Sequence, residues 1–127
     1  MMDMKTKEGM IEYCKKVCEK NNWILNKDEE TLNELIEGLV ENKKRYNYQS
    51  CPCRLASGVR ELDRDLICPC DYAPQDIQEY GTCYCNLYMR EDFYKTINKK
   101  YVLVPERRPI EKEKKVLDFI NKEGNVQ

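Results

Sequence analysis

The sequence contains no histidine, which excludes histidine-ligated metal sites and any cysteine–histidine catalytic pair. Its 22 basic and 23 acidic residues leave a net charge of −1, so no excess of positive charge indicates a nucleic acid or a membrane as partner. No apolar run is long enough for a membrane span, and the initial stretch MMDMKTKEGM lacks the apolar segment of a secretory signal. We therefore expect a cytoplasmic protein.

Cysteine, in contrast, is abundant. In a compartment that keeps thiols reduced, eight cysteines indicate metal or redox chemistry rather than a disulfide scaffold. Six of them form three C-x-C pairs, which are Cys51 with Cys53, Cys68 with Cys70, and Cys83 with Cys85. The other two, Cys14 and Cys18, lie four residues apart on a predicted apolar helix face, where core packing is one interpretation and a second redox pair the other.

The hydrophobic pattern predicts a small, mainly α single domain over residues 1–127. Helices are expected at 5–22, from Asp28 to about Tyr46, at 58–66, 74–81, 90–101 and 110–124, with an extended segment at 101–109. This places the paired cysteines in loops between short helices.

The chemistry of three pairs follows from their spacing. Two residues of extended chain span at most about 7 Å, so both thiols of a pair can reach one metal centre. A tetrahedral zinc ion or a cubane iron–sulfur cluster needs only four thiolates, which leaves two thiols beside it. A dithiol next to an iron–sulfur cluster can exchange electrons with it, although spacing alone leaves fifteen choices of four ligands from six cysteines.

The order CPC, CPC and C-x-C, preceded by LNELIEGLVENKKRY and followed by NLYM, resembles the catalytic chain of ferredoxin:thioredoxin reductases over about residues 23–90. The resemblance implies short helices with cysteine-bearing loops around a [4Fe–4S] cluster, and leaves 101–127 as a C-terminal extension. It implies four cluster ligands, which are Cys51, Cys68, Cys70 and Cys83. It also implies that Cys53 and Cys85 form the redox-active disulfide, with Cys53 attacking the substrate.

The implied function is the transfer of electrons from ferredoxin, or a similar one-electron donor, to the disulfide of thioredoxin or a similar protein. Photosynthetic members of the family also pair with a small variable subunit, which is a candidate partner here. They have a longer first gap than the 14 residues between Cys53 and Cys68, and a shorter second gap than the 12 between Cys70 and Cys83. They place a histidine where this chain has Tyr84, which is either a proton donor or a packing residue. EYGTCYCNLY is closer to the non-photosynthetic bacterial and archaeal members.

Two other classes of function remain open. One is an iron–sulfur electron-transfer or redox-sensing protein without disulfide turnover, and the other is a zinc-binding interaction module.

Several basic residues are also candidates for a functional role. Arg54, directly after Cys53, would favour a reactive thiolate or simply lie on the surface. Lys43, Lys44 and Arg45, with Arg107 and Arg108, are candidates for docking an acidic ferredoxin. For Lys43, Lys44 and Arg45, ordinary solvation at the end of a helix is an equal explanation.

Overall fold

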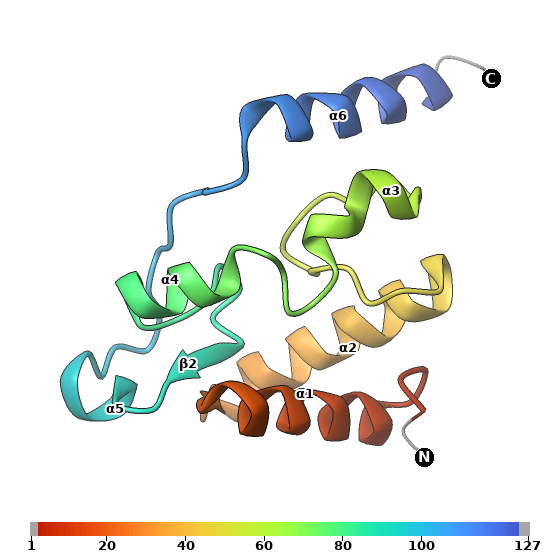
Figure 1. The fold of residues 1–127 in the computed structure, drawn as a ribbon. Coiled ribbons are helices and arrows are strands. Elements are labelled where there is room, and N and C mark those ends of the chain that lie inside the picture. Colours follow the sequence, from red (N-terminus) through yellow and green to blue (C-terminus); the bar gives the residue numbers. More distant parts are fainter. Residues whose placement is uncertain (1–2, 125–127) are drawn as a thin grey trace.

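Two N-terminal helices, α1 (Lys7–Asn21) and α2 (Glu29–Tyr46), pack together along one side of the molecule (Figure 1). The computed structural model describes residues 3–124, and side chains as far as residue 122. Both helices match the predicted ranges. Their contact surfaces come from apolar residues at helical spacing, namely Met10, Cys14 and Cys18 on α1, and Leu35, Ile36 and Leu39 on α2.

Local sequence determines where these helices begin and end. The Thr6 hydroxyl accepts a hydrogen bond from the Gly9 backbone N–H at 3.1 Å, which caps the start of α1. Asn22 ends the helix in the left-handed conformation, with φ of 60°. Asp28 occupies the predicted cap position of α2, but its carboxylate accepts a hydrogen bond from the Thr31 hydroxyl rather than from the backbone.

A two-stranded antiparallel sheet was not predicted. Strand β1 (Trp23–Leu25) pairs with β2 (Tyr88–Arg90), with Ile24 opposite Met89. The predicted helix at 90–101 is wrong over most of its length. Arg90 belongs to β2, only α5 (Phe93–Thr96) is helical, and Asn98 turns the chain with φ of 46°. The sheet joins the chain that follows the third cysteine pair to β1, which packs against α1.

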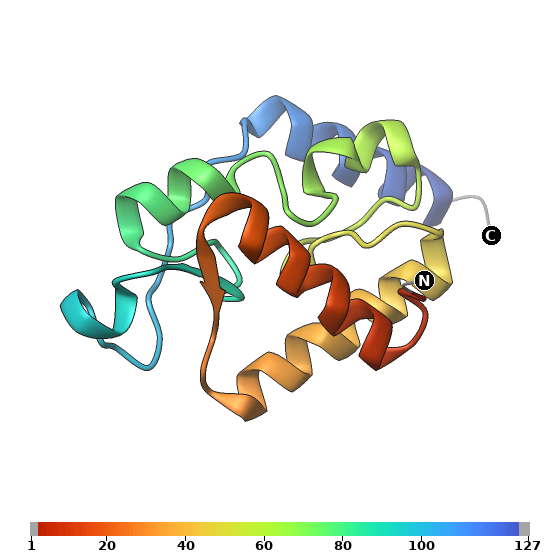
Figure 2. The same cartoon turned by 60° about the horizontal axis from the view of Figure 1, so that its bottom comes forward.

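The remaining cysteine pairs lie in irregular chain around short helices, as expected. These helices are α3 (Arg60–Asp63) with a following 3₁₀ turn (Arg64–Leu66), and α4 (Ala73–Tyr80). Gly81 ends α4 with φ of 84°, a conformation that favours glycine. Figure 2 shows α1 in front, with α3 and α4 on one side of it and α2 on the other.

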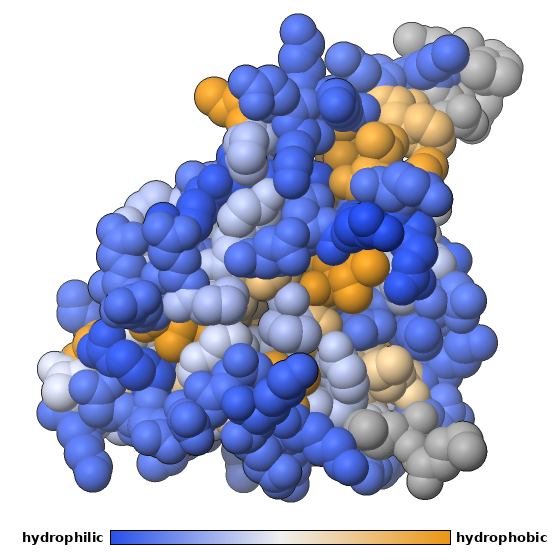
Figure 3. Space-filling model, viewed as in Figure 1, coloured by the Kyte–Doolittle hydropathy of each residue, from blue (hydrophilic) through white to orange (hydrophobic). Residues whose placement is uncertain are grey.

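The C-terminal part returns across the molecule before forming α6 (Ile110–Gly124). Figure 1 shows residues from about 98 to 109 as an extended trace that passes α4 and rises to α6 beside α3. Val104, Arg108 and Val116 are buried, so this part of the chain packs against the rest. Figure 3 shows a mostly hydrophilic face with small separate apolar patches. None of the described helices combines the length and apolarity that a membrane span requires.

Candidate iron–sulfur and disulfide site

The fold brings the paired cysteines together from three separate loops. Four of them are almost completely buried, with exposed fractions of 5% for Cys51, 6% for Cys68, 7% for Cys70 and 6% for Cys83. The other two differ, since Cys53 is exposed and Cys85 is half-buried. The Sγ atoms of Cys51 and Cys85 lie 2.8 Å apart, so the first and third pairs are in direct contact.

Backbone hydrogen bonds hold these loops in register. The Cys51 N–H donates to the Leu66 carbonyl at 2.8 Å, the Cys68 N–H to the Gln49 carbonyl at 2.8 Å, and the Cys83 N–H to the Tyr88 carbonyl at 3.0 Å. The Tyr13 hydroxyl adds a hydrogen bond from α1 to the Cys68 carbonyl at 2.8 Å. Each pair is therefore fixed through its own backbone, and α1 supports the second pair from behind.

The four buried cysteines line a shared cavity that is partly open to solvent. Its other lining residues are Pro52, Pro69, Ala73, Tyr84, Cys85, Leu87 and Tyr88. Within residues 3–124, no three cysteine, aspartate or glutamate side chains converge closely enough to bind a single metal ion. Thiols that surround a space, rather than point at one atom, suit a cubane cluster in which each iron takes one cysteine.

The electrostatics of the cavity also fit such a cluster. Burial raises the pKa of Cys70 to about 11 and that of Cys83 to about 12. Burial likewise raises the pKa of Cys68 well above its ordinary value. Thiolates in this environment need a positive charge close by, and coordinated iron would provide it. The residues present therefore fit a [4Fe–4S] cluster held by four thiolates.

A second space lies next to the cavity and opens to the surface. This groove is lined by Cys53, Tyr84, Cys85, Tyr101, Leu103 and Val104. Cys85 and Tyr84 line both spaces, whereas Cys53 lines only the groove. Cys85 is thus located between the buried thiols and the exposed one.

The two thiols that line the groove differ in acidity. Hydrogen bonding with the Cys51 and Cys85 thiols lowers the pKa of Cys53 well below its ordinary value, and the charge of Arg54 contributes in the same direction. Hydrogen bonding with Cys51 and Cys53 raises the pKa of Cys85. These directions favour ionisation of Cys53, the thiol that solvent reaches, over that of Cys85, and a thiolate is the nucleophilic form of cysteine.

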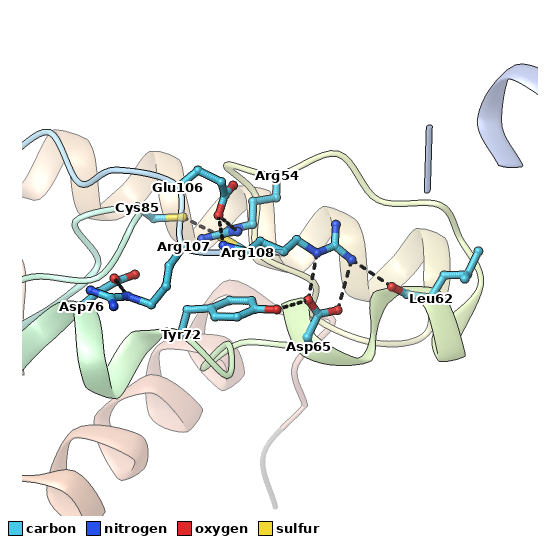
Figure 4. A network of polar contacts seen from close by, with 10 residues as sticks. Arg54, Leu62, Asp65, Tyr72, Asp76, Cys85, Glu106, Arg107 and Arg108 are labelled. Carbon is cyan, nitrogen blue, oxygen red and sulfur yellow. Dashed lines mark hydrogen bonds and ion pairs between the residues drawn. The ribbon is translucent and has the colours of Figure 1, made fainter. Parts of the chain in front are cut away.

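Arg54 lies beside the cysteines as a buried cation. Its side chain is only 4% exposed, so the interpretation of Arg54 as a surface residue is wrong. The guanidinium packs against the Tyr84 ring at 4.2 Å and the Tyr72 ring at 5.4 Å, and it forms an ion pair with Glu106 (Figure 4). Its Nε and Nη2 atoms are buried and have no hydrogen-bond partner among the described residues. A buried guanidinium with unpaired N–H groups favours the thiolate form of the cysteines beside it.

Two of the five basic residues considered for ferredoxin docking, Arg107 and Arg108, form ion pairs within the chain. Arg108 is buried and donates to both carboxylate oxygens of Asp65, at 2.8 and 3.1 Å (Figure 4). Arg107 pairs with Asp76 at 2.7 Å and with Glu79. These contacts fasten the C-terminal segment to the chain around the second cysteine pair. Arg108 is buried and does not lie at the surface for docking, whereas Arg107 is still 23% exposed.

Cys14 and Cys18 lie in the core behind the cavity. Their exposed fractions are 0% and 8%, and burial raises the pKa of both to about 11. The Tyr88 hydroxyl lies 3.8 Å from the Cys68 Sγ and also hydrogen-bonds to Cys14. The core-packing interpretation of the two helix cysteines agrees with these surroundings.

Comparison with known families decides what this arrangement is. The family model of the ferredoxin thioredoxin reductase catalytic beta chain matches residues 2–115. The chain belongs to this family. A search of curated proteins gives no match. The match extends beyond residues 23–90, on which the sequence resemblance depended, and includes α1 and the start of α6.

Membership in the ferredoxin thioredoxin reductase family gives the chemistry of the site. The enzyme uses electrons from ferredoxin to reduce thioredoxin through a [4Fe–4S] cluster and a redox-active disulfide. Sequence reasoning found all six paired cysteines, but it missed Glu106, Asn86 and Tyr88 as neighbours of the site. Asn86 and Tyr88 lie in the NLYM stretch after the third pair, but their contacts, like the position of Glu106, depend on distant segments and cannot be read from that stretch.

Proposed function

We propose that the two spaces divide the six cysteines into two functional sets. Cys51, Cys68, Cys70 and Cys83 would hold the [4Fe–4S] cluster in the buried cavity, and Cys53 and Cys85 would form the redox-active disulfide. The observation that carries this proposal is that Cys85 lines both spaces, while the exposed Cys53 lines only the groove. A disulfide in this position connects a buried electron source with a substrate at the surface.

The cluster supplies electrons one at a time, whereas a disulfide takes up two electrons and two protons to become a dithiol. In the reduced enzyme, the Cys53 thiolate attacks one sulfur of the substrate disulfide and displaces the other as a thiolate, which takes up a proton. The Cys85 thiol then loses its proton, and the resulting thiolate attacks the Cys53 sulfur of the mixed disulfide. This releases the second substrate sulfur as a thiolate, which takes up a proton. The enzyme disulfide is restored, and the substrate has gained two electrons and two protons.

Tyr84 is the residue we assign to hydrogen bonding during this exchange. Burial and the nearby Glu106 carboxylate raise its pKa above the ordinary value, so it keeps its proton at neutral pH. It lines both spaces and lies between Cys83 and Cys85 in the sequence. We propose that its hydroxyl donates a hydrogen bond to a departing thiolate, rather than acting as a titrating acid.

The differences between this chain and the photosynthetic members of the family support assignment to a particular group within the family. The presence of Tyr84 in place of histidine, and the spacing between the pairs, favour a non-photosynthetic bacterial or archaeal reductase. We propose a cytoplasmic enzyme, because free thiols require a reducing compartment. Its substrate would be thioredoxin or a thioredoxin-like protein, and a small variable subunit is a further candidate partner. We take residues 23–90 as the catalytic core of one domain, with 101–127 as its extension.

Serine substitutions distinguish the two cysteine sets. The wild-type chain, purified without oxygen, is expected to be brown and to contain about four irons. Replacing Cys51, Cys68, Cys70 or Cys83 should impair cluster assembly, because serine is a poor ligand for iron of this kind. Replacing Cys53 or Cys85 should leave the iron content unchanged and abolish thioredoxin reduction. Iron content and visible absorption provide the readout for the first set, and thioredoxin reduction provides it for the second.

Matched pairs of variants make this test specific. Cys51→Ser and Cys53→Ser alter two positions of the same loop, so a general folding defect would affect both. Loss of iron from Cys53→Ser with retention in Cys51→Ser would contradict the assignment. Continued thioredoxin reduction by both Cys53→Ser and Cys85→Ser would contradict the assignment of these two residues as the redox-active pair. A wild-type chain that contains the cluster but does not reduce thioredoxin would favour an electron-transfer protein without disulfide turnover.

A further inference from the structure

The extended segment before α6 presents two large apolar side chains to solvent. Tyr101 is 61% exposed and Leu103 is 80% exposed, whereas Val104 is only 4% exposed. Both exposed residues line the groove that contains Cys53. Large apolar side chains at such exposure, gathered in one groove, are typical of surfaces that contact another molecule.

The position of this segment is fixed by hydrogen bonds to the third cysteine pair. The Asn86 side chain donates to the Val102 carbonyl at 2.9 Å and accepts from the Val102 N–H at 2.9 Å. Asn86 directly follows Cys85, is fully buried, and has φ of 63°. Its carbonyl accepts a further hydrogen bond from the Asn26 side chain at 2.9 Å. Asn86 therefore sets the distance between Cys85 and the segment that carries Tyr101 and Leu103.

A second attachment lies a few residues further on. Glu106 forms the ion pair with Arg54, and Arg54 directly follows Cys53. The segment is thus attached on one side next to Cys85 and on the other next to Cys53. Leu103 lies between these two attachments and Tyr101 directly precedes the first, so both are held beside the reactive thiols although they do not belong to the cysteine loops.

We infer that Tyr101 and Leu103 form an apolar docking wall for the protein substrate, an inference that rests on the proposed function of the Cys53–Cys85 pair. A substrate sulfur has to come within bonding distance of Cys53, so the chain on either side of that sulfur must enter the groove. The occupant is a folded protein that presents apolar side chains next to its disulfide. Its contact with the wall buries apolar surface on both partners.

A comparison of protein and small-molecule disulfides tests this inference. The holoenzyme and its Tyr101→Ser/Leu103→Ser variant are reduced with dithionite, freed of excess reductant, and mixed with oxidised thioredoxin or with 5,5′-dithiobis(2-nitrobenzoate). We expect the ratio of the two second-order rate constants, protein over small molecule, to fall about 10-fold or more in the variant. The small molecule reports thiol reactivity, because it has no protein surface to dock.

The matched control is Ile110→Ser, which removes an apolar side chain that is 82% exposed and does not line the groove. Its ratio should equal that of the wild type. A wild-type ratio in the Tyr101→Ser/Leu103→Ser variant would overturn the docking wall and leave the proposed function intact. An equal fall in both rate constants would also overturn it, because the segment would then act on the thiols themselves. A wild-type enzyme that reduces neither disulfide would instead refute the proposed function.

Discussion

Arg54, the residue after Cys53, forms an ion pair with Glu106, which lies 52 residues further along the chain. This contact connects the first cysteine loop to the C-terminal segment. It also places a buried positive charge beside thiols that would otherwise lie in a mostly apolar cavity. Both consequences lead to measurable effects.

Arg54→Gln removes the charge but retains hydrogen-bonding groups. We expect the midpoint potential of the [4Fe–4S] cluster to fall by tens of millivolts, because a cation favours the more negative, reduced state. A redox titration followed by electron paramagnetic resonance measures this change. Arg54→Lys keeps the charge and should remain close to the wild-type potential. Equal shifts in the two variants would show that packing, rather than charge, is the relevant property.

Tyr84→Phe tests the proposed hydrogen bond while keeping the aromatic ring against Arg54. We expect kcat for thioredoxin reduction to fall about 3- to 10-fold with KM unchanged, which corresponds to the loss of one ordinary hydrogen bond. Tyr84→Ala should lose more activity, since the ring that packs on Arg54 is also removed. Full activity in the phenylalanine variant would limit Tyr84 to a packing role.

The double variant Cys14→Ala/Cys18→Ala tests whether the helix cysteines take part in the reaction. Both are buried in the core, so we expect a stability loss of about 1–3 kcal/mol in total, with cluster content and thioredoxin reduction retained. Denaturant titration and iron analysis provide the measurements. A stable, iron-containing variant that fails to reduce thioredoxin would instead indicate a second redox pair in α1.

Arg108→Met tests how firmly the C-terminal segment is attached. It leaves the buried Asp65 carboxylate without its cation, and we expect a loss of about 3–5 kcal/mol at neutral pH. Burial opposes ionisation of Asp65, but its hydrogen bonds with Arg108 and Tyr72 outweigh this effect and lower its pKa. The contribution of the pair is therefore present above about pH 4 and is lost as the pH falls through the lowered pKa. Denaturation should show a smaller difference from wild type at pH 3 than at pH 7. A loss at pH 3 as large as that at pH 7 would contradict the ionic origin.

Most of the helices, though not the one expected at 90–101, could be predicted from the sequence because their signals are local. Apolar spacing in α1 and α2 and the glycine after α4 each depend on residues within a few positions. The strand pair could not be predicted in this way. Trp23–Leu25 and Tyr88–Arg90 are three residues long and far apart in the sequence, so only their pairing makes them strands.

The same distinction applies to the site. The three C-x-C pairs are local motifs, so the six cysteines could be predicted as site residues from the sequence alone. The positions of Glu106 beside Arg54 and of Val102 beside Asn86 depend on the return of the C-terminal segment, which carries no motif of its own. For the same reason, the sequence does not show that Arg108 is buried against Asp65 or that Arg107 pairs with Asp76.

The central claim is that Cys53 is the thiol that attacks the substrate, and a trapped intermediate tests it most directly. Disulfide exchange passes through a mixed disulfide, which persists when the substrate lacks its second cysteine. The reduced holoenzyme is mixed with a thioredoxin whose second active-site cysteine is serine and whose first is activated as a mixed disulfide. Peptide mapping then locates the link. We predict attachment at Cys53. Attachment at Cys85, Cys51 or either cysteine of α1 would contradict the account.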